Sequence, residues 1–320
     1  MEELLESLTL QTLKDFEVII VEDGSIKTCK DVCDKYANIL DLHYYAKENS
    51  GPGQSRNYGA ERSNGEWLII LDSDVVLPES YLTAVDKAIT NHPASETPIT
   101  AWGGPDAAHP SFTPVQKAIS YSMTSFFTTG GIRGGKAKLD KVYPRSFNMG
   151  IRRDVYLQLG GFSKMRFGED IDFSYRIVEA GYMPRLFPDA WVWHKRRTDF
   201  RKFFRQVYNS GIARINLEKR HPGTLKLVHL LPMVFTLGVI GCLLLAPFCY
   251  GLTLLPLVLY CLLILTDSTL QNKSLQVGLL SIPAAFTQLM GYGFGFIESW
   301  WKRCVLKQDE FTAFEKNFYQ

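Results

Sequence analysis

The 320-residue sequence has little net charge, few cysteines and little low-complexity sequence. Its 35 Lys and Arg against 33 Asp and Glu leave a formal net charge of +2, which gives no case for nucleic acid as a partner. Hydrophobic residues make up 46%, which argues against disorder, and 25 glycines with 15 prolines argue against a fibrous repeat. Six cysteines without a recurring C-x-x-C pair argue against a zinc site and favour reduced thiols.

Charge is also nearly absent from one long part of the chain, from Leu227 to Ile297. A membrane span needs about 20 apolar residues, and the stretch from Leu227 to Thr266 is long enough for two spans that break near Pro247–Gly251. Leu275–Ile297 is long enough for a weaker third. The alternative, a buried helical hairpin of a soluble domain, is disfavoured because a core rarely demands so many uncharged residues. We therefore predict a membrane domain over residues 227–300 with two or three helices.

Basic residues flank this region on its N-terminal side: Lys195, Arg196, Arg197, Arg201, Lys202 and Arg205. Their excess predicts a multi-pass protein of the cytoplasmic (inner) membrane whose N-terminal domain faces the cytoplasm. Trp300 and Trp301 followed by Lys302 and Arg303 indicate a second cytoplasmic anchor. The two cues conflict with three spans, since an odd number would put the C-terminus outside. Either the third segment is re-entrant or interfacial, or the weaker basic cluster, Lys302 and Arg303, does not determine the side on which the C-terminus lies.

The N-terminal part alternates predicted strands with predicted helices. Phe16–Val21 and Trp67–Leu71 are short apolar runs typical of buried parallel strands, and Leu42–Ala46 is a further candidate strand. Helical spacing over Lys27–Ile39 and Gln54–Arg62 separates them. This order predicts a doubly wound α/β sheet, in which ligands bind beyond the carboxyl ends of the strands.

Acidic residues stand at those ends. Glu22 and Asp23 follow the first run, and Asp72 and Asp74 follow the second. Two carboxylates in one turn can face a single Mg²⁺ or Mn²⁺ that also binds substrate phosphates. The structural alternatives are a solvated turn at Asp72–Asp74 and a cap of the next helix by Glu22 and Asp23.

A second acidic group, Gly168 to Asp172, opens a predicted helix that runs to Ala180. Acids at a helix N-terminus are often only partners of the helix dipole, and Asp172 has the i,i+4 spacing of a structural pair with Arg176. Three acids in five residues exceed that need, and Asp170 is the candidate general base.

These motifs, taken in order, resemble the family 2 glycosyltransferases, inverting enzymes with the GT-A fold that use nucleotide-activated sugars. The resemblance covers about residues 3–215 and rests on an ordered set of segments: LLESLTLQTLKDFEVIIVEDGS between Glu3 and Ser25, Asn49–Asn57 with Ser55 in place of the usual Ala, Leu71–Asp74, Asn148–Arg153, Leu159–Phe162, Gly168–Asp170 and Val192–His194. The hydrophobic tail is similar to that of membrane-attached members that build surface polysaccharides.

The resemblance implies roles for particular residues. Nucleotide-sugar binding falls to Asp23, Glu22, Arg56, Asn57, Asp72 and Asn148, metal binding to Asp74, Asp72 and His194, and catalysis to Asp170 with Glu169. Asp170 would remove the proton from the acceptor hydroxyl, and Glu169 would orient the acceptor or the base. His194 would act as a neutral imidazole. Without the resemblance, a histidine between Trp193 and Lys195 is more often a surface or structural residue than a ligand.

The resemblance also predicts the domain organisation: a GT-A domain over residues 1–215, a basic juxtamembrane connector over 216–226, the membrane domain over 227–300 and a tail over 301–320. Family members usually start with an apolar strand that is not found before Met1–Leu5, so we expect the GT-A domain to be N-terminally incomplete. Gly130–Gly135 lacks the context of a P-loop, and we expect a mobile loop there with Arg133 and Lys136 available to phosphate.

The leading functional hypothesis is metal-dependent transfer of a sugar from a nucleotide-diphosphate sugar to a lipid-linked or growing glycan acceptor, with inversion at the anomeric carbon. The alternative is a non-catalytic, glycosyltransferase-like membrane scaffold of a polysaccharide assembly complex. A processive synthase is disfavoured, because no Q-x-x-R-W segment follows the acidic motif.

Overall fold

The chain forms two compact units in the computed structural model, which describes residues 1–93, 95–129, 142–195 and 197–310. Among these residues, unit 1 is built from 1–109 and 142–195, and unit 2 from 110–129 and 197–310. The predicted division at residue 215 falls inside a helix of unit 2, Phe200–Arg220. Each unit is described by itself.

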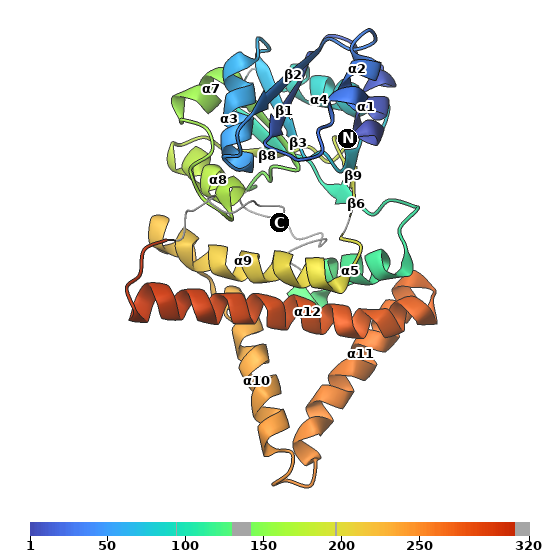
Figure 1. Cartoon of the computed structure of the whole chain (residues 1–320), viewed down its shortest axis with the longest axis vertical. Coiled ribbons are helices and arrows are strands. Elements are labelled where there is room, and N and C mark those ends of the chain that lie inside the picture. The colour runs from blue at the N-terminus through green and yellow to red at the C-terminus, as the bar shows by residue number, and fades with distance from the viewer. Residues whose placement is uncertain (94, 130–141, 196, 311–320) are drawn as a thin grey trace. The chain divides into compact units, whose positions relative to one another are not determined.

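Unit 1 is the α/β part of the chain (Figure 1). Its helices are α1 Glu2–Thr9, α2 Lys30–Tyr36, α3 Pro52–Arg62, α4 Tyr81–Thr90, α7 Arg153–Gln158 and α8 Glu169–Glu179. Its strands are β1 Val18–Asp23, β2 Leu42–Lys47, β3 Trp67–Leu71, β4 Val75–Val76, β5 Ala101–Gly103, β6 Asp106–Ala107, β7 Asn148–Arg152, β8 Arg185–Leu186 and β9 Val192–His194.

The strands of unit 1 pair in both directions. β1 and β2 are parallel, with Val18 opposite Leu42. A second group has the order β3-β7-β5-β8, in which β7 is antiparallel to β3 and β5, and β5 is parallel to β8. The third has the order β4-β9-β6, antiparallel and then parallel. The predicted α/β class with a mixed sheet is confirmed.

The predicted strands are present, with one shift at the first, but the prediction of buried parallel strands is only partly right. β1 is parallel to β2, whereas β3 lies at the edge of its group and pairs antiparallel with β7, and most residues of β1 and β3 are half-buried. The run predicted over 16–21 is β1 at Val18–Asp23, so Glu22 and Asp23 are the last residues of the strand and not a turn after it. Parallel pairing with β2 extends the strand through both acids. Helix α3 packs on this strand, because Gly59 leaves room for the β-branched side chains: a Cβ at Gly59 would lie 3.4 Å from Ile19 and Val21.

The core of unit 1 centres on buried aromatic side chains. Trp102 is fully buried and stacks on Phe187, with ring centroids 5.0 Å apart. Gly150 of the neighbouring strand β7 makes room for the indole, since a Cβ there would lie 2.0 Å from the Trp102 ring. Phe162 and Phe173 form a second cluster under α8. This packing fixes the positions of β7 and α8, which carry residues described below.

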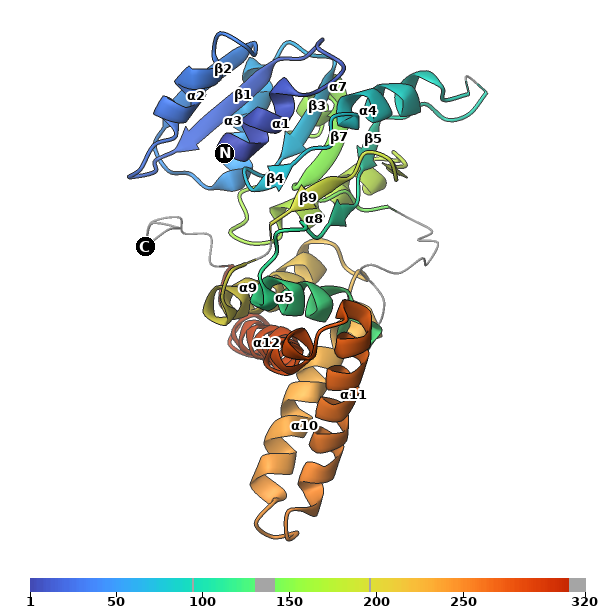
Figure 2. The same ribbon diagram turned by 90° about the vertical axis from the view of Figure 1, so that its right-hand side faces the viewer.

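Unit 2 is helical. It comprises α5 Pro114–Thr124, α6 Phe126–Thr129, α9 Phe200–Arg220, η1 Leu227–His229, α10 Leu231–Leu245, η2 Leu252–Leu254, α11 Leu255–Asn272, α12 Leu275–Trp300 and η3 Trp301–Val305. Within this unit, α10 and α11 form a hairpin that projects from a layer of α9, α12 and α5 (Figures 1 and 2). The predicted break at Pro247–Gly251 is the connection of this hairpin.

Three segments of unit 2 are long and apolar enough to cross a membrane, as predicted: Leu227–Leu245, Leu252–Asn272 and Leu275–Val305. They differ in how much of each is covered by protein. The first two are 11% buried, whereas the third is 44% buried and less apolar. Lipid contact is therefore natural for the hairpin, while α12 is largely engaged within unit 2.

Candidate active site

The end of β1 fixes the loop that leads into α3. The Asp23 carboxylate accepts hydrogen bonds from the backbone N–H groups of Ser50 and Gly51, both at 2.9 Å, and forms an ion pair with Lys47. Gly51 has a φ of 91°, a conformation that suits glycine. Asp23 thereby determines where α3 begins, and Lys47 is a site residue that the sequence did not reveal.

Glu22 fixes the turn before α2. Its Oε2 accepts a hydrogen bond of 2.8 Å from the Cys29 N–H. Burial raises the pKa of Glu22, but hydrogen bonds from Ser25 and Cys29 outweigh it and lower the pKa below its usual value. Glu22 is thus an anion beside Asp23 at the carboxyl end of the strand.

Arg56 joins two of the acidic motifs. From α3, its Nη2 donates to Asp72 Oδ1 at 2.8 Å, just past β3, and its Nη1 donates to Glu169 Oε1 at 3.1 Å, in the first turn of α8. The guanidinium also lies over the Phe162 ring, 5.3 Å from its centroid. The side chain is only 18% exposed, so the two charge-assisted bonds are shielded from bulk water. Motifs that are far apart in the sequence therefore meet at one edge of unit 1.

Asp72, Asp74 and His194 form a candidate metal-binding cluster. Each offers one ligand atom, and these atoms lie within 4.8 Å of one another. The pairing of β4 with β9 brings them together, because Val75 lies opposite His194. His194 Nε2 is 3.3 Å from Asp74 Oδ1. The three residues are those predicted to bind metal.

A fourth carboxylate faces the other nitrogen of the histidine ring. His194 Nδ1 lies 3.8 Å from Asp106 Oδ2 and, among the described residues, has no hydrogen-bond partner at closer range. Phe147 stacks on the same ring, with centroids 5.0 Å apart. Asp106 lies on the two-residue strand β6, which has no periodic signal in the sequence.

The electrostatics of the cluster favour a cation. Burial lowers the pKa of His194, but Asp106 and Asp74, with the charge of Asp72, outweigh burial and raise the pKa to about 9. The negative potential that retains this proton would equally attract a divalent ion. The two carboxylates are the oxygen ligands that suit Mg²⁺ or Mn²⁺, so these two residues fit the predicted metal, and the His194 imidazole is a further possible ligand.

Glu169 and Asp170 open α8 after Gly168, and both side chains are largely buried. Burial and the neighbouring Asp170 raise the pKa of Glu169. Burial would also raise the pKa of Asp170, but Arg145, which donates from Nε at 2.6 Å, and the charge of Arg56 outweigh it and lower the pKa. Adjacent carboxyl groups whose pKa values are pushed apart have different protonation roles, and Asp170 is the ionised one.

Asp172 has the structural role that its spacing predicts. Its Oδ2 accepts from Arg176 Nε at 3.0 Å and from Ser163 Oγ at 2.7 Å. Arg176 donates in turn to the carbonyls of Leu159 and Gly161. This network anchors the loop before α8 and leaves the first two acids of the helix for the site.

Asn57 and Asn148 have their side chains engaged within the protein. Asn57 Oδ1 accepts from Tyr156 Oη and Phe162 N, while Asn148 Oδ1 accepts from Tyr81 Oη at 2.7 Å. Asn148 is fully buried. Their predicted contact with a nucleotide sugar stays a prediction. The Gly130–Gly135 loop with Arg133 and Lys136, and Arg196 of the basic flank, lie outside the described residues.

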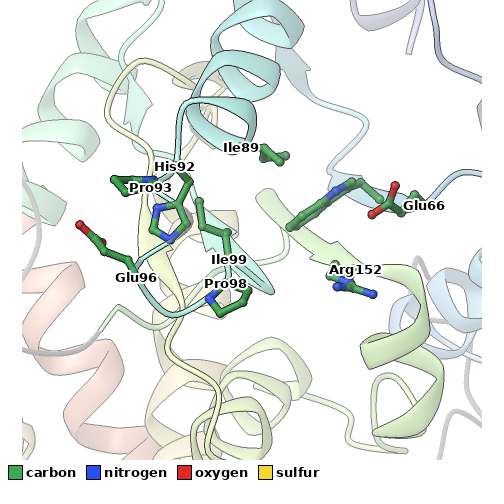
Figure 3. A pocket seen from close by; sticks show the side chains of 9 residues that line it. Glu66, Ile89, His92, Pro93, Glu96, Pro98, Ile99 and Arg152 are labelled. Carbon is green, nitrogen blue, oxygen red and sulfur yellow. The ribbon is translucent and has the colours of Figure 1, made fainter.

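A surface pocket of about 260 Å³ lies apart from these residues (Figure 3). Trp67 and Arg152, which pair across β3 and β7, line it together with His92 and Glu96. Trp67 begins β3, whereas Asp72 follows its other end. The pocket is therefore at the opposite end of the strand from the acidic cluster. His92 Nε2 forms a hydrogen bond of 2.8 Å with Thr97 O, and Glu96 Oε2 accepts one of 3.0 Å from Arg185 Nη2.

Strands and helices in this order, with a D-x-D turn after the apolar strand β3 and an acidic helix start beside it, define an α/β protein of the GT-A class. The fold matches that of a mannosyltransferase from Pyrobaculum calidifontis, whose structure was solved in complex with GDP-Man and Mn²⁺. The TM-score is 0.54 at 16% sequence identity, over 94% of this chain and 83% of that one. The predicted GT-A fold is confirmed.

Residues 1–156, just under half of the chain, match the sequence model of glycosyl transferase family 2, and this part of the chain is similar to that family. Relatives include the pre-mycofactocin glycosyltransferase of Mycobacterium tuberculosis, 26% identical over 66% of this chain, and an uncharacterized glycosyltransferase of Haemophilus influenzae, 28% identical over 55% of it. The aligned parts are 44% and 56% of those proteins, so the chain spans about half the length of these relatives. The family match includes the D-x-D turn and ends before α8.

Proposed function

We propose that unit 1 transfers a sugar from a nucleotide-diphosphate sugar to an acceptor hydroxyl, with inversion at the anomeric carbon. The observation that carries this proposal is the bridge by Arg56, which bonds Asp72 of the candidate metal cluster and Glu169 beside the candidate base. A donor diphosphate and an attacking hydroxyl must meet within a few ångströms for transfer to occur. A single guanidinium between the two groups supports such a meeting point.

The donor side would be formed by the ends of β1 and β3. Asp23 and Glu22 would recognise the base, and Arg56, Asn57 and Asp72 would hold the rest of the nucleotide sugar, with the fully buried Asn148 supporting them from the core. Asp72, Asp74 and His194 would hold Mg²⁺ or Mn²⁺. When bound, such a cation neutralises charge on the leaving nucleoside diphosphate. The ligands GDP-Man and Mn²⁺ of the structural neighbour belong to the same chemical classes.

The acceptor side would use Asp170 as the general base. As the acceptor oxygen forms its bond to the anomeric carbon, its proton passes to the Asp170 carboxylate and the bond to the diphosphate oxygen breaks. One displacement of this kind inverts the anomeric centre. The lowered pKa of Asp170 supports its part, because the group is ionised before the acceptor arrives. Glu169, whose pKa is raised, would orient the acceptor by a hydrogen bond.

The acceptor would be lipid-linked or a growing glycan at a membrane. The apolar segments of unit 2 support membrane attachment. The basic residues Arg201, Lys202 and Arg205 of α9 support a cytoplasmic position for the flank that follows unit 1, and thus an inner-membrane protein whose catalytic unit faces the cytoplasm.

Transfer assays on the full-length protein in membranes test the proposal. UDP- and GDP-sugars are screened with Mg²⁺ or Mn²⁺ for the wild type, Asp170→Asn, Asp74→Asn and the control Asp86→Asn, an exposed residue of α4. We expect Asp170→Asn to reduce turnover about 10²- to 10⁴-fold while donor binding persists, Asp74→Asn to weaken metal-dependent donor binding, and Asp86→Asn to match the wild type. Full turnover in Asp170→Asn contradicts the proposed base. Nucleotide binding without turnover in the wild type would instead identify a non-catalytic scaffold.

A further inference from the structure

Helix α12 is packed along α9 over most of its length. Residues later in α9 contact residues later in α12. Phe200, at the start of α9, packs near Leu280. Further along, Ser299 Oγ donates to Ile212 O at 3.2 Å, and Arg303 Nε, just after α12, donates to Asn216 Oδ1 at 3.0 Å. The two helices therefore run parallel and side by side, as Figures 1 and 2 show. Whatever depth α12 has in a membrane, α9 must share it.

Glycines make this pairing close. A Cβ on Gly295 would lie 2.0 Å from Tyr208 O, and one on Gly211 would lie 2.2 Å from Tyr292 O. The backbones thus meet without a layer of side chains between them. Near the same place, Tyr208 Oη donates to the Glu298 carboxylate. Separating α12 from α9 would break this interface along several turns.

Helix α9 is too polar to lie inside a bilayer. Its exposed side chains include a series of cations at both ends: Arg201, Lys202, Arg205, Lys219 and Arg220. Charged side chains within the hydrocarbon are costly and are rarely found facing lipid. If α12 crossed the membrane, α9 would be carried in with these charges.

The free face of α12 suits a membrane surface. Leu275, Leu279 and Phe294 of α12 are exposed by 61%, 53% and 37%, and at 3.6 residues per turn they lie within about 100° of one another around the helix. Trp301, at the start of η3, is 51% exposed. The opposite side is buried in unit 2 at Ser281 and Ser299. An apolar stripe backed by a polar partner helix is the pattern of helices that lie in the interface plane.

The hairpin gives the direction of the membrane. α10 and α11 are exposed over most of their surface. α12 runs across the base of the hairpin in Figure 1 and is seen nearly end-on at that base in Figure 2. The 19 residues of Leu227–Leu245 reach roughly 28 Å as a helix, close to the thickness of the hydrocarbon core. A hairpin standing along the membrane normal leaves α12 along the surface.

We infer that only α10 and α11 cross the bilayer, and that α12 lies with α9 in the interface on the side where the hairpin starts. The partner of the apolar face of α12 is the phospholipid surface. Trp300, Trp301, Lys302 and Arg303 then lie on the same side as the cations of α9, so both basic clusters obey the same orientation rule. The inference rests on the proposed membrane attachment and is independent of sugar transfer.

Single-cysteine labelling in the full-length protein tests this topology. The native Cys304 is exposed just after α12 and serves as one reporter once the other five cysteines are replaced by Ser. The other two reporters are Lys273→Cys, between α11 and α12, and Lys202→Cys, on α9. Each is introduced into a protein in which all six native cysteines, including Cys304, are replaced by Ser. A membrane-impermeant maleimide is applied to sealed inside-out and right-side-out vesicles, and then after detergent.

We expect all three cysteines to react in the same vesicle orientation, and all to react in detergent. Labelling of Lys273→Cys and Cys304 from opposite sides would overturn the inference, since α12 would then span. A Cys304 that reacts only in detergent would overturn it as well, because the end of α12 would lie within the bilayer. Release of the protein by alkaline carbonate would instead contradict membrane attachment itself, and transfer assays on the same vesicles report separately on the proposed activity.

Discussion

Arg145 donates from Nε to the Asp170 carboxylate at 2.6 Å, across 25 residues of chain. Arg145 lies just before β7 and Asp170 lies in the first turn of α8, so the pair joins the strand that borders the site to the helix that carries the candidate base. The charge of Arg145 is the largest influence that lowers the pKa of Asp170 against the opposing effect of burial. The arginine therefore sets how readily the carboxylate accepts a proton.

Replacing Arg145 is expected to change the pH dependence of transfer. In Arg145→Gln the pKa of Asp170 rises, because the charge of Arg56 then opposes the effect of burial without that of Arg145. Protonated Asp170 cannot act as a base, so the acidic limb of the kcat/KM profile moves to higher pH and the loss of activity is greater at pH 6 than at pH 8. Arg185→Gln, which removes an exposed partner of Glu96, is the control. Parallel profiles for Arg145→Gln and wild type would contradict the coupling.

Asp106 is expected to act on the metal through His194. A carboxylate facing the second nitrogen of a ligating imidazole fixes the orientation of the ring and raises its basicity, and its loss typically weakens metal binding about 10- to 100-fold. We therefore expect Asp106→Asn to raise the Kd for Mn²⁺ by about that factor, measured by electron paramagnetic resonance without any turnover. Asp189→Asn, on the exposed segment after β8, is the matched control. An unchanged Kd in Asp106→Asn would remove this role.

Metal affinity is expected to rise with pH, because the cation must displace a proton from His194. With a pKa of about 9 in the metal-free protein, the ring is protonated at pH 7. Displacing one proton makes Mg²⁺ binding about tenfold tighter per pH unit between pH 7 and pH 9. In the absence of metal, the stabilisation from protonated His194 is complete below about pH 6.5 and is lost as pH rises through about 9. Calorimetric titration at pH 7 and pH 8 checks the slope, and His194→Gln should flatten it.

Local sequence patterns predicted the elements that carry the site better than the contacts within it. Trp67–Leu71 is a strand with the predicted bounds, and α8 opens at the predicted acids, because β-branched runs and helical spacing are local signals. The pairing of Asp106 with His194 and that of Arg145 with Asp170 depend on which strands neighbour each other. Strands of two or three residues, such as β6 and β9, carry no periodicity that would reveal this.

For a similar reason, the sequence alone did not distinguish two membrane spans from three. Leu275–Val305 has the hydropathy of a span, and hydropathy takes no account of the partner helix. The inference that α12 is interfacial rests on its close approach to α9. That approach depends on glycines whose neighbours are about 85 residues away along the chain, as the 87-residue separation of Ser299 and Ile212 illustrates. Composition alone left the interfacial and spanning alternatives open.

Asn148 is expected to stabilise unit 1. Its Oδ1 accepts from Tyr81 Oη at 2.7 Å and its Nδ2 donates to Ala190 O at 2.8 Å, all within the core. Asn148→Ala leaves these buried groups unpaired, which costs about 1–3 kcal/mol of the free energy of unfolding. Denaturant unfolding measures the loss, and Tyr81→Phe, which removes one of the bonds, should cost less. Unchanged stability together with lost donor affinity would instead favour the predicted contact with the nucleotide sugar.

The interface between α9 and α12 is expected to tolerate no side chain at Gly295. In Gly295→Val the new Cβ would meet Tyr208 O at 2.0 Å, so the two backbones must move apart. Overpacking of this kind costs about 1–3 kcal/mol, and we expect a lower Tm in detergent, followed by tryptophan fluorescence. Gly241→Val on α10 is the matched control, since a Cβ there has nothing within 4 Å. Its Tm should equal or exceed that of the wild type, because valine has a higher helix propensity than glycine. Equal Tm values for the two variants would mean that α12 does not lie against α9, and the argument for an interfacial α12 would fail with it.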